Sequence, residues 1–292
     1  MSNGNQEIVF SIDALPPPKM AEKAEDVGVA KANMDFLTTL GLAILAGAFI
    51  ALGAMFSTTV TAGAEGNIYY GAGRLLGGLT FCLGLILVVV AGAELFTGNN
   101  LIVMAFVSGK VTLAKLLRNW VIVYVGNFIG SIATAGIMVY CGRYKWAQGI
   151  IWLNAMNIAH AKCSKPFVDL FFLGIMCNAL VCLAVWMCFG ARSTTDKILS
   201  IIFPITAFVA CGFEHSVANM YFIPVALFVN TAASPEFWTT VGKTAENFPN
   251  LTWSNFFIGN LIPVTLGNIV GGSGLVGLVY WLTYRRKYRI TA

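Results

Sequence analysis

Charged side chains are scarce in this sequence. Only 11% of its 292 residues are Asp, Glu, Lys or Arg, whereas 58% are hydrophobic. Soluble domains carry about a quarter charged residues, so the composition excludes an ordinary soluble protein. The mean hydropathy of +0.77 and the long apolar segments instead predict a polytopic membrane protein with one embedded domain.

The motifs of nucleotide-binding and hydrolytic enzymes are also missing. The sequence has no P-loop, no Gly-x-Ser-x-Gly and no Rossmann fingerprint. Its seven cysteines show no Cys-x-x-Cys or Cys/His metal spacing, and most lie in apolar segments, where they are expected as small buried side chains. We therefore predict a protein without cofactor, metal site or enzymatic activity.

Six apolar segments reach the ~20 residues that a membrane helix needs. They are 36–60, 75–109, 119–140, 167–191, 198–230 and 255–284. With the N-terminus inside, twelve Lys and Arg residues fall on the inner side and six on the outer side, as the positive-inside rule favours. Both termini are thus expected in the cytoplasm. The net charge of +5 then reflects topology, and no nucleic-acid partner is expected.

The segment before the first span is polar and shows no cleavable signal peptide. Residues 1–34 are expected to form a cytoplasmic tail with a short amphipathic helix. Two roles remain open for this helix: a pH-dependent gate under the inner mouth, or an interfacial anchor. The membrane domain covers 35–284, and 285–292 form a C-terminal cytoplasmic tail.

Two apolar segments are too long for one span. Residues 74–110 and 197–236 would each form a helix of ~50 Å at 1.5 Å per residue, whereas the hydrocarbon core is ~30 Å thick. Each carries one acidic residue near its middle, Glu94 and Glu214. Each segment is therefore either a hairpin of two spans or one span interrupted at mid-membrane.

An internal repeat decides between these alternatives. Residues 92–100 ("GAELFTGNN") and 212–220 ("GFEHSVANM") share Gly, Glu and Asn at a spacing of 120, and 119–130 and 260–271 share two Asn and two Gly at a spacing of 141. Three spans per half is an odd number, so the second half is inverted. We predict an all-α membrane protein with six transmembrane helices in an inverted 3+3 repeat (35–140 and 167–284), the second and fifth helices being broken. This arrangement points to a transport site at the midplane.

The repeated polar residues have a structural interpretation. Unwound backbone in a membrane leaves amide groups that need partners, and a carboxylate accepts several N–H bonds. Glu94 and Glu214 are therefore expected to stabilise the breaks by accepting hydrogen bonds from the unwound backbone, together with the repeated Asn99 and Asn219.

Beyond each break a half-helix restarts near the centre of the membrane. Thr97 and Ser216 are candidates to cap these half-helices, whose N-termini carry partial positive charge and would favour an anion.

His215 has Leu95 as its counterpart in the first half, so the fold does not need this histidine twice. It is either a hydrogen-bonded core residue or, because ionisable groups at membrane depth are usually functional and histidine titrates near neutral pH, a functional one. We favour the functional interpretation. The other histidine, His160, falls in the outer loop between the halves and is expected to be solvated.

The segments "VVAGAELFTG" (89–98), "GIMCNALVCLAVW" (174–186), "GFEHSVANM", "ASPEFWTTVG" and "NLIPVTLGNIVGG" resemble signatures of the formate–nitrite transporter family, and most of all its formate branch. The resemblance runs along the whole chain. It implies an aquaporin-like protomer, a homopentamer with one pore per subunit, and a location in the bacterial inner membrane. It implies transport of formate and similar small monovalent anions across the lipid bilayer.

The resemblance also assigns residue roles. It implies a central histidine at His215, a threonine that hydrogen-bonds it at Thr97, and an outer basic residue that gathers anions at Lys162. It places Asn178 along the path. The implied constrictions are Phe81, Leu85, Phe208 and Phe96.

The residues themselves support a narrow, dry pore. Phe81 and Leu85 are four positions apart and share one helix face, and apolar narrowings exclude hydrated ions. Alternatively, these are ordinary lipid-facing or core side chains. Nitrite or hydrosulfide transport and an aquaporin-like neutral-solute pore remain open, although paired Asn-Pro-Ala breaks are missing. An enzyme using Glu214 and His215 is disfavoured, because adjacent helical residues do not face each other.

Overall fold

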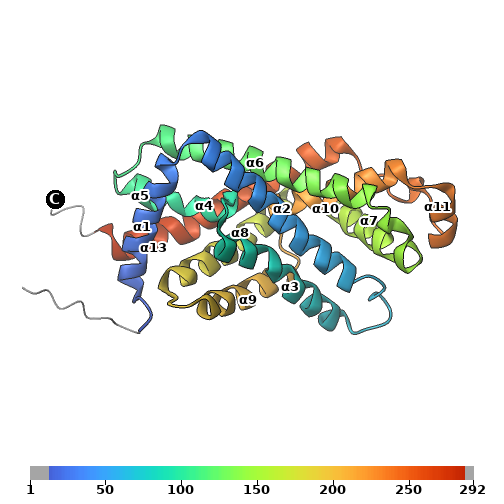
Figure 1. Cartoon of the computed structure of the whole chain (residues 1–292), viewed down its shortest axis with the longest axis horizontal. Helices are drawn as coiled ribbons and strands as arrows, with labels where there is room; N and C mark the ends of the chain where they lie inside the picture. Colours follow the sequence, from blue (N-terminus) through green and yellow to red (C-terminus); the bar gives the residue numbers. More distant parts are fainter. Residues whose placement is uncertain (1–12, 287–292) are drawn as a thin grey trace, which may run out of the picture.

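The computed structural model describes residues 13–286, and residues 143–145 by their backbone only. Most of the expected C-terminal tail (285–292) and the first part of the N-terminal tail lie outside these residues. Within the described part, the helices form an elongated bundle, with α1 and α13 near one end and α7 and α11 near the other (Figure 1). We call these the tail end and the cap end.

The first half of the bundle contains three spans, of which the second is broken. This span begins with α3 and the π-helical turn η1, unwinds at residues 93–95 and continues in α4. Gly92 turns the chain there with φ +86°, a value that residues with a Cβ rarely adopt. The elements are α2 Phe36–Val60, α3 Tyr70–Ile86, η1 Leu87–Gly92, α4 Phe96–Asn99, η2 Asn100–Ile102, α5 Val103–Val107 and α6 Leu113–Tyr140.

The second half repeats this plan. Its middle span begins with α9, unwinds at residues 211–215 and continues in α10. Gly212 lies in the unwound stretch with φ +75°. The prediction of an inverted repeat with broken second and fifth helices is therefore confirmed. The elements are α8 Phe167–Gly190, α9 Thr194–Ala210, α10 Ser216–Ala232, η5 Asn255–Leu261, α12 Ile262–Ile269, η6 Val270–Leu278 and α13 Val279–Tyr284.

Glycines allow the first and third spans of each half to touch. A Cβ at Gly130 of α6 would collide with the carbonyl oxygen of Ile44 in α2, and a Cβ at Gly271 of η6 would collide with that of Ile175 in α8. Small residues commonly permit such close approach of membrane helices. The same packing device thus recurs in both halves.

The segment between the halves is more ordered than the outer loop that the sequence indicated. After η3 (Arg143–Gly149) it forms the 14-residue helix α7 (Ile150–Cys163), which packs on α10. A further helix, α11 (Pro235–Val241), and the short turn η4 (Ala245–Asn247) follow α10. The buried face of α7 has helical spacing and consists of Trp152, Ala155, Met156 and Ala159.

The helix of the N-terminal tail, α1 (Pro17–Asn33), docks on the tail end of the bundle. It contacts η2, α5, α6, α8 and α13. Its apolar face therefore lies against protein. Its buried hydrophobic residues are Met20, Ala21, Ala24 and Ala32.

Candidate functional site

Two cavities enter the bundle from opposite sides of the helix breaks. The tail-side cavity, of about 500 Å³, lies among α1, η1 and the first break. The cap-side cavity, of about 550 Å³, lies among the start of α3, α7 and the second break. Leu85 lines the former and Phe81 the latter. Along α3 the two cavities are thus separated by about one helical turn, ~5.4 Å.

An apolar partition closes the space between the cavities. Phe81, Leu85 and Phe208 are buried, and the rings of Phe81 and Phe208 meet edge-on with centroids 5.4 Å apart. Phe222 stacks on Phe81 at 6.2 Å and also lines the cap-side cavity. Sequence reasoning did not single out Phe222, because it lies among many apolar residues of α10.

His215 lies at this partition and lines the cap-side cavity. Its Nε2 is 2.9 Å from Thr97 Oγ1, which comes from the other half of the chain. Its Nδ1 accepts the N–H of Ala218 at 3.0 Å. The ring stacks on Phe208 with centroids 5.9 Å apart. The structure thus brings together three residues that the sequence singled out: His215, Thr97 and Phe208.

The two contacts of the ring define its tautomer. Because Nδ1 accepts a backbone N–H, the proton of the neutral ring must be on Nε2, which then donates to Thr97 Oγ1. A second proton on Nδ1 would face the Ala218 N–H and break that bond. The geometry therefore suits a neutral histidine that offers a hydrogen bond from Nε2.

His215 is also the N-cap of α10, which corrects two expectations. Thr97 Oγ1 contacts His215 instead of capping α4, and the N-cap of α4 has no side-chain bond. Ser216 Oγ is buried without a hydrogen-bond partner among the described residues. The histidine takes the capping position because it directly precedes the first turn of α10.

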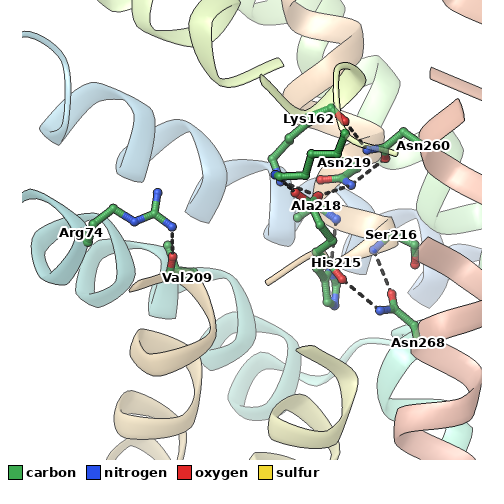
Figure 2. Close-up of polar contacts among 11 residues, drawn as sticks. Arg74, Lys162, Val209, His215, Ser216, Ala218, Asn219, Asn260 and Asn268 are labelled. Carbon is green, nitrogen blue, oxygen red and sulfur yellow. Dashed lines mark hydrogen bonds and ion pairs between the residues drawn. The ribbon is translucent and has the colours of Figure 1, made fainter. Parts of the chain in front are cut away.

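Glu214 is held by two lysines and an asparagine. Lys162 Nζ donates to Oε2 at 2.8 Å, and Lys165 Nζ donates to Oε1 at 2.6 Å. Asn219 Nδ2 donates to Oε2 at 2.9 Å and to Asn260 Oδ1 at 2.7 Å. Figure 2 shows Lys162, Asn219 and Asn260 gathered beside His215, whereas Arg74 lies apart and donates to the Val209 carbonyl oxygen.

Glu94 has the corresponding environment at the first break. Lys31 Nζ donates to its Oε1 at 2.6 Å, and Asn99 Nδ2 donates to its Oε2 at 2.7 Å and to Asn119 Oδ1 at 2.9 Å. Asn119 Nδ2 then donates to the Lys31 carbonyl oxygen, as Asn260 does to that of Lys162. Sequence reasoning missed Lys31, which lies on α1 and 63 positions from its partner.

Two asparagines of the repeat satisfy the unwound backbone. Asn127 Oδ1 accepts the N–H of Phe96 at 2.9 Å, and its Nδ2 donates to the carbonyl oxygens of Ala43 and Glu94. Asn268 makes the same three bonds at the second break, to the Ser216 N–H and to the carbonyl oxygens of Gly174 and Glu214; Figure 2 shows the bond to Ser216. This corrects the expectation that the glutamates accept backbone N–H groups: their carboxylates bind side-chain ammonium and amide groups.

Asn178 and Phe96 lie behind the cavity walls. Asn178 is buried, and its Nδ2 donates to the carbonyl oxygens of Asn268 at 2.7 Å and Thr97 at 3.3 Å. The Phe96 ring packs edge-on against Tyr124 at 4.9 Å. Neither side chain lines either cavity. Both side chains therefore support the cavity walls from behind and are not part of the cavity lining.

His160 is less solvated than expected. Its ring is partly buried and packs edge-on on Phe248 at 5.8 Å, and its Nδ1 is buried without a hydrogen-bond partner in the described part of the chain. It lies on the last turn of α7. Because α7 is a docked helix, this residue packs in the cap end.

Two cavities that approach one dry partition, within an inverted repeat of broken membrane helices, define a membrane pore for small solutes. The family model described as formate/nitrite transporter matches residues 18–282. The chain belongs to the formate/nitrite transporter family.

Relatives and solved structures of this family are similar over most of their length. The chain is 48% identical over 275 residues to the formate channel FocA of Escherichia coli (strain K12), covering 94% of this chain and 96% of that protein. It is 41% identical over 278 residues to the formate channel FocA of Haemophilus influenzae, covering 95% and 97%. A solved pentameric formate channel with formate bound has a TM-score of 0.81 at 48% identity, covering 85% of this chain and 97% of that one.

Proposed function

We propose that this protein is a channel for formate and similar small monovalent anions, in a bacterial inner membrane. The single observation that carries the proposal is a pair of cation-lined cavities separated by a dry partition that contains a histidine. The similarity to formate channels supports formate as the anion. The solved pentamer supports a homopentamer with one pore per subunit. The tail end then faces the cytoplasm and the cap end the outside, with lipid around the apolar spans.

Both cavities carry an excess of positive charge, which favours entry of anions. Three cationic and two acidic residues line the cap-side cavity, and three lysines and one glutamate line the tail-side cavity. The charged residues of the cap-side cavity are Arg74, Lys162, Lys165, Glu65 and Glu214. Those of the tail-side cavity are Lys23, Lys31, Lys197 and Glu94.

The partition resists the charged form of the anion. Moving a bare carboxylate into an apolar environment costs several kcal/mol, and apolar constrictions commonly gate pores in this way. His215 relieves part of this cost, because its Nε2–H can donate to the anion in place of Thr97. Asn178 supports this exchange by holding the Thr97 backbone, and Phe96 supports it by packing behind the first break.

Proton transfer to the anion requires a further change. The neutral ring would have to take up a proton at Nδ1 and release the Ala218 N–H before it could give up the one on Nε2. In our proposal, the resting pore therefore shares a hydrogen bond with the anion, and proton-coupled passage occurs only when the N-cap of α10 opens.

The test is flux through the purified protein in proteoliposomes, with formate, nitrite, hydrosulfide, glycerol and water compared in parallel. We expect fast formate flux and negligible glycerol flux. Glycerol flux equal to formate flux would identify a neutral-solute pore, and nitrite or hydrosulfide flux well above that of formate would move the protein to another branch of the family.

A further inference from the structure

The two helix breaks differ in the number of lysines on their glutamates. Glu94 is paired with Lys31, whereas Glu214 is paired with both Lys162 and Lys165. One carboxylate balances one ammonium group, so the second break has a surplus positive charge. The repeat requires one lysine per break, and the additional lysine therefore needs another explanation.

The two lysines on Glu214 are held differently. The Lys162 side chain is 15% exposed, its Nζ lies 5.4 Å from the centroid of the Phe222 ring, and its carbonyl oxygen accepts a bond from Asn260. It also belongs to the last turn of the docked helix α7. Lys162 is therefore fixed in place.

Lys165 is the freer of the two. It lies in the short connection between α7 and α8, its side chain is 33% exposed, and it lines the cap-side cavity. Within the described part of the chain, its ammonium group hydrogen-bonds to Glu214 Oε1, whereas Lys162 and Asn219 both bind Oε2. Lys165 can thus leave Glu214 without leaving that carboxylate buried and uncompensated, which would be costly.

We propose that Lys165 captures the anion in the cap-side cavity. Its ammonium group exchanges Glu214 Oε1 for an entering small carboxylate and holds it in the cavity that His215 also lines. Lys162 remains on Glu214 and preserves the helix break. The proposal rests on the anion-channel function above and moves the anion-gathering role from Lys162 to Lys165.

Other charged groups facing this cavity are less suited to the role. The Arg74 guanidinium is engaged with the carbonyl oxygens of Val209 and Ala210 at the end of α9. Glu65 lies in the exposed loop between α2 and α3 and repels an anion. Lys165 is left as the cation that is both accessible and exchangeable.

The experiment compares the full-length protein with K165Q, K165R and K162Q. Formate binding to purified protein is followed by ¹³C-formate NMR line broadening, and formate flux is measured in proteoliposomes. We expect K165Q to weaken formate binding and raise the half-saturating concentration at least about ten-fold, the lower end of the range for one lost hydrogen bond to a charged group. Its maximal flux and thermal stability should stay unchanged, and K165R should restore binding.

K162Q supplies the contrast, because it should lower thermal stability and assembly. Exposed Lys243, outside the cavity walls, gives the matched control K243Q, which should behave as wild type. Unchanged binding and half-saturation in K165Q would overturn the proposal, as would a loss of stability equal to that of K162Q. A wild-type protein without formate flux would refute the proposed function, and the binding measurement would still decide the role of Lys165.

Discussion

At His215, one side chain caps α10, contacts the opposite half of the chain and faces a cavity. A functional histidine at a partition is usually considered for its proton alone. Here its removal would also take away the acceptor for the Ala218 N–H. Variants at this position must therefore separate capping from proton chemistry.

We predict that His215→Asn keeps formate flux but flattens its pH dependence. An Asn side chain caps a helix well and offers an N–H toward the pore, but it does not titrate. His215→Ala should still assemble and lose about 1 kcal/mol of stability with the cap, together with altered flux. Flux across a pH series is the measurement. Retention of the wild-type pH profile in His215→Asn would contradict a role for the imidazole.

The buried glutamates are predicted to be structural. Glu94→Ala or Glu214→Ala removes a buried carboxylate and leaves half-buried lysine ammonium groups without their partner; breaking such a pair costs up to about 3–5 kcal/mol, and should reduce folded oligomer. Thermal melting of the detergent-solubilised oligomer measures the loss. Glu236→Ala, at an exposed position of α11, is the control and should melt as wild type. Normal assembly and flux in the glutamate variants would show that the breaks do not need them.

Leu85→Ala is predicted to relax the exclusion of larger solutes. Leu85 lines the tail-side cavity, so its truncation should widen the partition and admit glycerol or larger carboxylates. Leu170→Ala is the matched control, because Leu170 is a buried residue of α8 outside both cavity walls. This variant should lose about 2–5 kcal/mol of folding stability without a change in selectivity. If Leu85→Ala loses as much stability and keeps its selectivity, Leu85 is core packing.

At the scale of elements, α1 is tied to the rest of the tail end by Glu25. This carboxylate is buried, and Arg285 donates two hydrogen bonds to it at 3.0 and 3.1 Å, with Lys110 at 2.8 Å. Burial raises the pKa of Glu25, but the hydrogen bonds from Arg285, Lys110 and Ser108 outweigh burial and hold the pKa below its ordinary value. The contact therefore joins α1, the loop before α6 and the end of α13.

The sign of this shift limits Glu25 as a pH sensor. An unfolded glutamate titrates near 4.3. The stability from Glu25 is fully present above that pH, and it is lost only as the pH falls through the lower folded pKa. Mild acidification leaves this contact intact. A gate formed by α1 that responds near neutral pH would need another titrating group.

We predict that hydrogen exchange of α1, corrected for intrinsic rates, stays constant between about pH 5 and 8 and rises only below about pH 4. Glu25→Gln should increase exchange at every pH. Glu22→Gln is the control, because Glu22 forms an exposed ion pair with Lys19 one turn away, and such pairs contribute little. An α1 that already loosens between pH 7 and 5 would show that a different group holds it.

At the scale of the whole molecule, close contact between spans depends on glycines in both halves. We predict that Gly130→Ala and Gly271→Ala each prevent folding, because the added Cβ meets a carbonyl oxygen of the neighbouring helix. Gly136→Ala in α6 is the control: among the residues that the structure describes, nothing lies within 4 Å of its Cβ position, and the substitution should be neutral. Yield of the folded oligomer after size-exclusion chromatography decides. Wild-type yield for Gly271→Ala would show that α8 and η6 can move apart.

The sequence by itself determined the spans, the two breaks and the repeat, since each can be recognised from short stretches of sequence without knowing how those stretches pack. Apolar length, a Gly-x-Glu at the middle of a segment and its recurrence at 120 residues need no tertiary information. It also singled out His215, which interrupts the symmetry of the repeat. The residues of the partition were predicted mainly from the resemblance to the family. The hydrophobic pattern alone could not single them out, because Phe and Leu residues are common in this chain.

Only the tertiary structure decided which groups pair with the buried glutamates and with the unwound backbone at the two breaks. Lys31 reaches Glu94 across 63 positions, Asn127 reaches Phe96 across 31, and Lys165 reaches Glu214 across 49. Such pairs form because helices from distant parts of the chain bring their polar side chains to the same depth. A buried polar group must find a partner wherever the fold places one, and no local spacing in the sequence records that choice.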